Sequence, residues 1–309
     1  MIENIYNIAK LLKNDDIEYN FDENLKEHCT FKIGGNASIF CKPKNNLQLC
    51  KTIKILSSNN IVYFLLGKGS NVLFADEGFF GAVVRVPDMP QSICVNGNTL
   101  SASAGTDLAK VCKAARDAEL SGIEFAFGIP GSIGGAVFMN AGAFGGEMKD
   151  ILINIDYFDG NEIKTIEAKD AEFGYRTSIF NKNPWCVLSA SFTLKKALKS
   201  DINDKMKEYA QKRKDKQPLD LPSAGSAFKR PIGAFAGALI DNSGLRGYTV
   251  GGAAISDKHC GFIVNLGEAT CKDVLQLADE VCNKVKDKTG YTLEKEIRVI
   301  SCNGKMDIK

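Results

Sequence analysis

The chain has 309 residues, of which 44% are hydrophobic and 25% are charged, as in an ordinary soluble protein rather than a disordered or membrane-embedded one. Its 39 basic and 37 acidic residues leave a net charge of +2, which gives no electrostatic footprint for nucleic acid, so we expect no nucleic-acid partner. The length exceeds what one compact core usually accommodates, so we expect two or three domains.

The first region begins with an amphipathic helix, because acidic and amide side chains interrupt the opening MIENIYNIAKLLKNDD. This pattern disfavours a signal peptide, and no stretch is long enough to cross a bilayer, so we expect a cytoplasmic protein without a membrane partner. Periodicity then predicts a loop at 30–36, a helix at 46–59, and strands at 61–66 and 82–86.

The second region opens with a strand at 99–104 and a helix at 106–120 that Gly122 would end. Strands at 151–157 and 185–194 follow. In the second of these, alternation predicts one shared face, made by Cys186, Leu188, Ala190, Phe192 and Leu194. This order of helices and strands favours the α+β class over repeated βαβ units.

A lysine-rich helix at 201–218, ended by Pro218, marks the predicted crossing into a third region and exposes a solvated face. The remaining elements are a glycine-rich loop at 223–227, a helix at 235–242 ended by Gly244, a strand at 262–265, a helix at 270–289 and a last strand. In the helix at 270–289, Thr270 and Asp273 have capping-box spacing. In the last strand, alternation places Glu296 and Arg298 on one face.

The ten cysteines are scattered, without a CxxC pair and without a cluster around His28 or His259. This spacing predicts neither a metal site nor a disulfide framework, and free thiols in a reducing cytosol account for it.

Three glycine-rich segments, FKIGGNA at 31–37, LLGKGSN at 65–71 and GIPGSIGGAVFMNAGAFGG at 128–146, dominate the first two regions. Glycine lets the backbone approach a ligand closely and present N–H groups to anionic oxygens, as a cofactor pyrophosphate requires. Val72 stands where a dinucleotide fingerprint needs its third glycine, and no phosphate-loop motif occurs. Each segment taken singly is equally compatible with a tight turn.

Three side chains are candidates for catalysis. Arg176, in EFGYRTSIF, can bind a carboxylate or stabilise a developing enolate. Ser226, in LPSAGSAFKRP, can donate a proton from a turn beside two cations, and Glu296, in TLEKEIRVI, can act as an acid. A surface ion pair, a turn residue and a solvated strand face remain the alternative interpretations. Ser226 lacks a GxSxG context, and neither histidine suggests a hydrolase triad.

Taken together and in order, these segments resemble the UDP-N-acetylenolpyruvoylglucosamine reductase family. The matching segments also include LIDNSGLRGYTVGGAAIS and LEKEIR, and they extend from about residue 31 to residue 300. The resemblance implies an α+β protein: a two-lobed FAD-binding fold of the vanillyl-alcohol oxidase-like (PCMH) type, followed by a C-terminal α+β substrate-binding domain. We expect the lobes at 1–90 and 91–200 and the substrate domain at 201–309.

The resemblance also implies the reaction. NADPH would reduce a non-covalently bound FAD, which would in turn reduce the enolpyruvyl group of UDP-N-acetylglucosamine enolpyruvate to UDP-N-acetylmuramate for peptidoglycan synthesis. Ser226 would be the proton donor, while Arg176 and Glu296 would stabilise the enolate-like intermediate. The expected partner is the small-molecule substrate UDP-N-acetylglucosamine enolpyruvate, and the enzyme is expected to be a monomer.

By the same resemblance, two sets of residues would bind ligands. The FAD-binding set is Gly67, Lys68, Gly69, Ser70, Asn71, Pro130, Gly131, Ser132, Ile133, Gly135, Ala136, Ala141 and Gly146. The substrate-binding set is Gln217, Lys229 and Arg230.

Two features depart from the best-known branch of the family. Only six residues separate Ser178 from Trp185, which leaves no room for that branch's tyrosine-bearing insertion, so the chain resembles the shorter second type. Arg230 replaces an asparagine of that branch and is a plausible diphosphate partner.

Two other functions remain as alternatives. An oxidase on the same flavin fold would show a residue placed for covalent flavin attachment, and the sequence has no clear motif of this kind. A nucleotide-binding module without catalysis would lack at least one of Arg176, Ser226 and Glu296, all of which are present.

Overall fold

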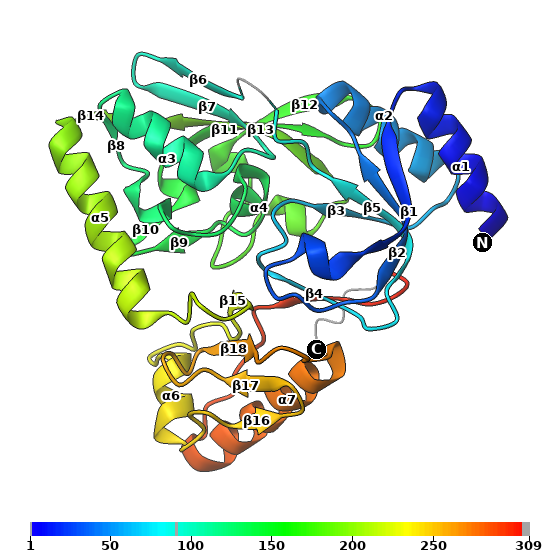
Figure 1. Cartoon of the computed structure of the whole chain (residues 1–309). Coiled ribbons are helices and arrows are strands. Elements are labelled where there is room, and N and C mark those ends of the chain that lie inside the picture. Colours follow the sequence, from blue (N-terminus) through cyan, green and yellow to red (C-terminus); the bar gives the residue numbers. More distant parts are fainter. Residues whose placement is uncertain (1, 90–91, 305–309) are drawn as a thin grey trace. The chain divides into compact units, whose positions relative to one another are not determined.

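The computed structural model describes residues 2–89 and 92–304 (Figure 1). The chain divides into two compact units, and it passes between them several times. The first unit comprises Met1–Asn20, Phe40–Lys68 and Val83–Lys212, and the second comprises Phe21–Ile39, Gly69–Ala82 and Arg213–Lys309. The division into domains at 90 and 200 remains a prediction.

The first unit is built on a five-stranded antiparallel sheet with the order β12-β11-β13-β7-β6. Its strands are β6 (Ile93–Asn96), β7 (Thr99–Ser103), β11 (Leu152–Phe158), β12 (Ile163–Glu167) and β13 (Cys186–Thr193). The face predicted for the last of these is confirmed, since all five of its residues are buried. Burial of this face fixes the strand register, because a slip by one residue would turn it toward water.

Helices and short strands complete this unit. They are α1 (Ile2–Asn14), α2 (Asn46–Ser58), β3 (Tyr63–Leu66), α3 (Leu108–Asp117), β8 (Leu120–Ser121), α4 (Ile133–Phe138), β9 (Gly142–Ala143), β10 (Gly146–Glu147), β14 (Lys195–Lys196) and the larger part of α5 (Lys199–Lys216), whose last turn belongs to the second unit. The short α4 packs on β13 and β7. The first part of α5 buries Ile202 and Met206 in the same core, so this helix is only partly a solvated face.

The prediction that Gly122 ends the second-region helix is wrong. α3 begins after Asp107, whose carboxylate accepts a backbone N–H of the first turn. It ends before Glu119, which itself adopts the left-handed conformation at φ +57°. The sequence pattern pointed to Gly122 because glycine is the usual residue in that conformation, whereas a glutamate has it here.

Three of the points where the chain passes between the two units lie in strands: β1 (Glu18–Asn24), β2 (Asn36–Lys42) and β5 (Phe79–Arg85). The other two follow Lys68 and Lys212. With β3, the three strands form a four-stranded sheet in the order β1-β2-β5-β3.

The second unit contains a small antiparallel sheet with the order β15-β18-β17-β16 and two helices beside it (Figure 1). The elements are β4 (Val72–Phe74), β15 (Ser223–Ser226), α6 (Ala236–Asn242), β16 (Thr249–Val250), β17 (Ala253–Ile255), β18 (Phe262–Asn265), α7 (Cys271–Thr289) and β19 (Arg298–Ile300). β19 and β4 pair in parallel.

The predicted capping box of α7 is confirmed. The Thr270 hydroxyl accepts the Asp273 N–H at 3.1 Å, and the Asp273 carboxylate accepts the Thr270 N–H at 3.0 Å. A third group contributes from another strand, because the Asp76 carboxylate accepts the N–H of Cys271 at 2.8 Å and that of Lys272 at 3.2 Å. The N-terminus of α7 is thereby tied to the segment that follows β4.

Within the described ranges, all ten cysteines are free, no cluster of three or more acidic, cysteine or histidine side chains could hold a metal ion, and no helix combines the length and apolar character needed to cross a membrane. Both histidines serve local structure. His28 Nε2 lies 2.8 Å from Glu23, and His259 Nδ1 accepts the Gly261 N–H at 3.1 Å. Burial lowers the pKa of His259, which favours its neutral form.

Candidate active site

Arg176 lies in a tight turn of the first unit. Gly174 and Thr177 exchange two backbone hydrogen bonds across it, at 3.0 and 3.4 Å. A Cβ at position 174 would come within 2.9 Å of Thr177 Cγ2, so a larger residue there would displace that side chain. Arg176 itself has φ +58°, and its guanidinium lies 5.1 Å from the ring centre of Tyr175. The turn therefore holds a cation on a partly exposed side chain beside an aromatic ring.

Ser226 and Glu296 lie on neighbouring segments of the second unit. Phe228 forms an antiparallel bridge with Lys295, and the Glu296 N–H donates to the Ala227 carbonyl at 2.8 Å. Because Ala227 directly follows Ser226, this pairing brings two predicted catalytic residues from distant parts of the sequence to adjoining positions. Both side chains are partly buried.

The local structure around these two residues differs from the prediction. The segment expected to be a flexible loop is the strand β15, in which Ser226 lies opposite Phe262 of β18. A bulge with Gly225 at φ +78° interrupts this pairing. Likewise, β19 begins only at Arg298, so Glu296 precedes the last strand. Hydrogen bonding to neighbouring segments, rather than local propensity, sets both conformations.

The three predicted substrate-binding residues are in the second unit, close in sequence to Ser226 or at the end of α5. The Gln217 N–H donates to the carbonyl of Arg213 at 2.8 Å. Lys229 Nζ lies 3.0 Å from a carboxylate oxygen of Glu294 on the paired segment. The exposed Arg230 guanidinium lies 4.4 Å from the ring centre of Phe235. Two cations thus follow Ser226 closely, one of them already in an ion pair.

The first predicted cofactor segment places a glycine against a helix start. A Cβ on Gly67 would come within 2.5 Å of Ser132 Oγ, so the Ser132 side chain packs against the backbone of Gly67. Lys68 Nζ lies 3.2 Å from Asp107 Oδ2, and the Arg85 guanidinium donates to the Gly67 carbonyl. One cation therefore bonds to the backbone of this segment, and the next residue along carries a second cation that is in an ion pair. Arg85 and Asp107 were not predicted, because no sequence motif marks either one.

Some glycines and backbone N–H groups of the glycine-rich segment around α4 are needed for packing within the protein. The N–H groups of Ile133 and Gly134 already donate to backbone carbonyls at 3.0 and 2.7 Å, and a Cβ on Gly134 would come within 2.9 Å of Ala104 Cβ. Gly135 is different, because its Cβ would meet only a serine hydroxyl, at 3.6 Å. Glycine inside a helix costs about 1 kcal/mol relative to alanine. Since packing does not require it, Gly135 fits a site where a ligand approaches the backbone.

Three of the other predicted cofactor residues have structural constraints of their own. A Cβ on Gly69 would come within 2.2 Å of the His28 carbonyl oxygen, and Gly69 has φ +67°. The Asn71 carbonyl accepts the N–H of Arg298 at 3.2 Å. Gly146 faces the Phe125 ring, which a Cβ would approach within 2.6 Å. These glycines would be needed whether or not FAD is bound.

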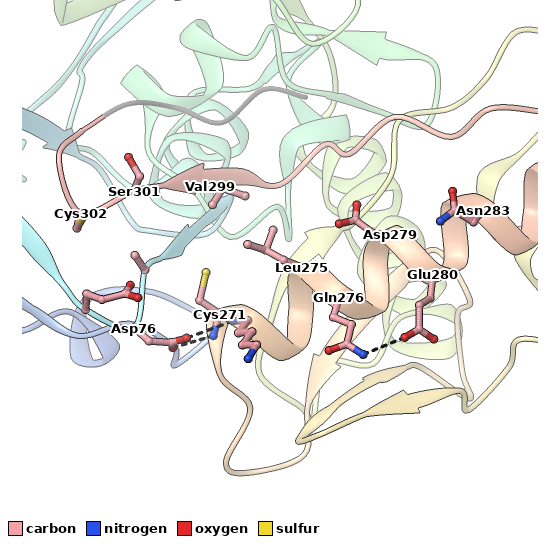
Figure 2. Close-up of a pocket in the computed structure, with 13 residues that line it drawn as sticks. Asp76, Cys271, Leu275, Gln276, Asp279, Glu280, Asn283, Val299, Ser301 and Cys302 are labelled. Atoms are coloured by element: carbon pink, nitrogen blue, oxygen red, sulfur yellow. Dashed lines mark hydrogen bonds between the residues drawn. The ribbon is translucent and has the colours of Figure 1, made fainter.

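A groove of about 700 Å³ lies in the second unit, between α7 and the β4–β19 pair (Figure 2). Several of its polar side chains are engaged within the protein: Asp76 binds the start of α7, Gln276 donates to Glu280, and Asp279 pairs with Lys295 at 2.6 Å. None of the predicted site residues lines it.

Comparison with known proteins gives two family matches. Residues 37–163 match the FAD binding domain, and residues 217–300 match the C-terminal domain of UDP-N-acetylenolpyruvoylglucosamine reductase. The predicted fold class, an α+β FAD-binding fold followed by a C-terminal domain, is thereby confirmed.

Whole-chain similarity agrees with these matches. UDP-N-acetylenolpyruvoylglucosamine reductase of Lachnoclostridium phytofermentans is 45% identical over 90% of this chain and 92% of its own, and that of Clostridioides difficile is 43% identical over 96% and 98%. The crystal structure of UDP-N-acetylenolpyruvylglucosamine reductase from Thermus caldophilus superposes with a TM-score of 0.77 at 36% identity, covering 92% of this chain and 98% of that one. The chain therefore belongs to the UDP-N-acetylenolpyruvoylglucosamine reductase family and is an FAD-dependent oxidoreductase.

Proposed function

We propose that this chain reduces the enolpyruvyl group of UDP-N-acetylglucosamine enolpyruvate to give UDP-N-acetylmuramate in peptidoglycan precursor synthesis, with NADPH as the reductant. Family membership supports the reaction class. The antiparallel pairing that brings Ser226 beside Glu296 is the observation that carries the assignment of residues. We further propose that the enzyme acts as a monomer in the cytoplasm.

Residues of the glycine-rich segments would hold FAD without a covalent bond. Lys68 and Arg85 supply positive charge near Gly67, and Gly135 leaves open space beside α4. FAD, when bound, supplies the carrier that passes a hydride from NADPH to the substrate. The protein contributes orientation, charge and a proton.

The proposed roles follow from the charge that the reaction generates. Hydride addition at the vinyl terminus breaks the carbon–carbon double bond and pushes an electron pair toward the substrate carboxylate. The Arg176 guanidinium, which stays charged, would stabilise that developing charge. Ser226 Oγ would then give its proton to the carbon next to the carboxylate, which completes the D-lactyl ether. Glu296, in its acid form, would hydrogen-bond to the enolate-like intermediate.

Three residues of the second unit, Gln217, Lys229 and Arg230, would bind the sugar nucleotide. Arg230 offers a fixed fork of donors that suits a diphosphate, and Lys229 offers a point charge. Since Lys229 is paired with Glu294, a bound diphosphate would compete with that carboxylate for the ammonium group. Gln217 would add a neutral donor at the end of α5.

The variant Ser226→Ala tests the proton-donor role. We expect NADPH to reduce the flavin at the wild-type rate, and we expect anaerobic reoxidation by UDP-N-acetylglucosamine enolpyruvate to slow by about 10²–10⁴-fold, the range typical of a lost general acid. Stopped-flow absorbance of the flavin measures both steps. Ser223→Ala, in the same strand β15, is the matched control and should leave both rates unchanged.

An equal loss of both half-reactions in Ser226→Ala would contradict the proton-donor assignment. A flavin that NADPH reduces but that only oxygen reoxidises would instead support an oxidase on the same fold.

A further inference from the structure

The conformation of Arg176 requires support from outside its own turn. A left-handed φ is unfavourable for a residue with a long side chain, and Arg176 adopts it at +58°. The two hydrogen bonds between Gly174 and Thr177 close the turn but do not connect it to the rest of the first unit. Other contacts must therefore set where the guanidinium points.

Two buried polar side chains make such contacts, one on each side of the turn. Asn140 is 1% exposed, and its Nδ2 donates to the Gly174 carbonyl at 3.0 Å. Ser178 is fully buried, and its Oγ donates to the Phe138 carbonyl at 2.8 Å. Phe138 is the last residue of α4, and Asn140 follows two residues later. Both bonds therefore tie the turn to the end of α4, in the segment proposed to bind FAD.

The hydrogen bonds of Asn140 leave its amide only one orientation. Nδ2 also donates to Glu147 Oε2 at 2.7 Å, and Oδ1 accepts the Lys149 N–H at 3.0 Å. Rotating the amide by half a turn would set an oxygen against two acceptors. Asn140 itself has φ +42°, a conformation that asparagine tolerates better than most residues. The side chain that holds the turn, Asn140, is therefore itself fixed by hydrogen bonds from both ends of its amide group.

We propose that Asn140 and Ser178 are positioning residues, which fix the Arg176 guanidinium relative to the FAD-binding segment so that it meets the substrate carboxylate as charge develops there. The inference rests on the role proposed above for Arg176. It predicts that weakening either bond will slow the substrate half-reaction and leave the NADPH half-reaction unchanged.

The test uses Asn140→Asp and Ser178→Ala in the FAD-loaded enzyme. Asn140→Asp keeps shape and tolerance of a positive φ but replaces the donor by a carboxylate oxygen. We expect reoxidation by UDP-N-acetylglucosamine enolpyruvate to slow about 10- to 100-fold, as for a misplaced reactive group, with flavin reduction by NADPH within about twofold of wild type. Ser178→Ala removes one hydroxyl only, so it remains informative if the aspartate variant folds poorly.

The control is Thr52→Val in α2, which deletes a buried hydroxyl that donates to the Gln48 carbonyl at 2.8 Å. It should lower the melting temperature much as Ser178→Ala does, without changing either rate. Arg176→Gln completes the design. In that background Asn140→Asp and Ser178→Ala should cause no further loss, because they act through the arginine.

Three results would overturn the proposal: additive losses in the Arg176→Gln background, equal slowing of both half-reactions, or unchanged reoxidation in both Asn140→Asp and Ser178→Ala, which are called the tether variants below. If Arg176→Gln alone leaves reoxidation at the wild-type rate, the role proposed for Arg176 fails and this inference fails with it. If Arg176→Gln is slow while the tether variants are fast, only the positioning inference fails.

Discussion

The variant Gly67→Ala separates packing from cofactor binding in the first glycine-rich segment. Its Cβ would lie 2.5 Å from Ser132 Oγ but 3.7 Å from Ser132 Cβ, so only the hydroxyl has to move. Rotating the hydroxyl away gives up its N-cap bond to Gly135, which at 3.5 Å is long. We expect a cost of about 0.5–1 kcal/mol, the lower part of the range for N-caps, and a drop in melting temperature of roughly 1–4 °C.

The effect of Gly67→Ala on FAD affinity should be separable from its effect on the stability of the FAD-free protein. If the cofactor lies against Gly67, the added methyl overpacks the site by about 1–3 kcal/mol, which weakens FAD binding about 5- to 150-fold. The double variant Gly67→Ala/Ser132→Ala removes the clash, so its melting temperature without FAD should equal that of Ser132→Ala. Its FAD affinity should stay low. Titration of the FAD-free proteins with FAD, followed by flavin fluorescence, measures this affinity.

Recovery of FAD affinity in the double variant would refute the reasoning, because the defect would then come from the displaced hydroxyl alone. Wild-type affinity in Gly67→Ala would refute it more directly, since no cofactor could then approach the backbone at that position.

Further predictions concern the second unit and the thiols. Gly35→Ala should destabilise the fold by about 3 kcal/mol or more, because its Cβ would come within 2.3 Å of the Asp76 carbonyl oxygen, which cannot rotate away; an unchanged thermal melt would contradict this. Thr270→Ala should cost about 0.5–2 kcal/mol in denaturant unfolding, and Thr270→Ser should retain most of the stability. The backbone hydrogen bond from Thr270 holds the pKa of Asp273 below its ordinary value. The resulting stability is therefore present above that ordinary pKa and is lost as pH falls through the lowered one, so Asp273→Asn should flatten the acid side of a stability–pH profile. Cys94 is exposed and should react first with a thiol reagent on the folded enzyme, and Cys94→Ser should remove that fast phase.

Elements with strong local signals could be predicted from the sequence. The α7 capping box and the buried face of β13 depend on residues a few positions apart, so the pattern contains all the information. Elements that depend on a distant partner could not be predicted in the same way. The segment SAGS at 223–226 has neither alternation nor β-branched residues, and it is a strand because β18 pairs with it.

The site shows the same division. Arg176, Ser226 and Glu296 could be proposed because their side chains have chemistry of their own and their motifs resemble a family. The pairing of the segments that carry Ser226 and Glu296 required the structure, since the bridge between Phe228 and Lys295 is made by backbone atoms.

Asn140 and Ser178 explain why such supporting residues escape sequence analysis. Each donates to a backbone carbonyl, which every residue possesses, so no complementary residue type marks the partner position in the chain. An ion pair such as Lys229–Glu294 at least leaves two opposite charges to be noticed. A buried side chain that donates to a carbonyl shows in the sequence only as one polar residue among apolar ones. Removing that side chain costs stability because the carbonyl is left without a hydrogen bond. Positioning residues such as Asn140 and Ser178 are therefore recognised in the structure, as buried side chains that bond to the backbone of a turn carrying a reactive group.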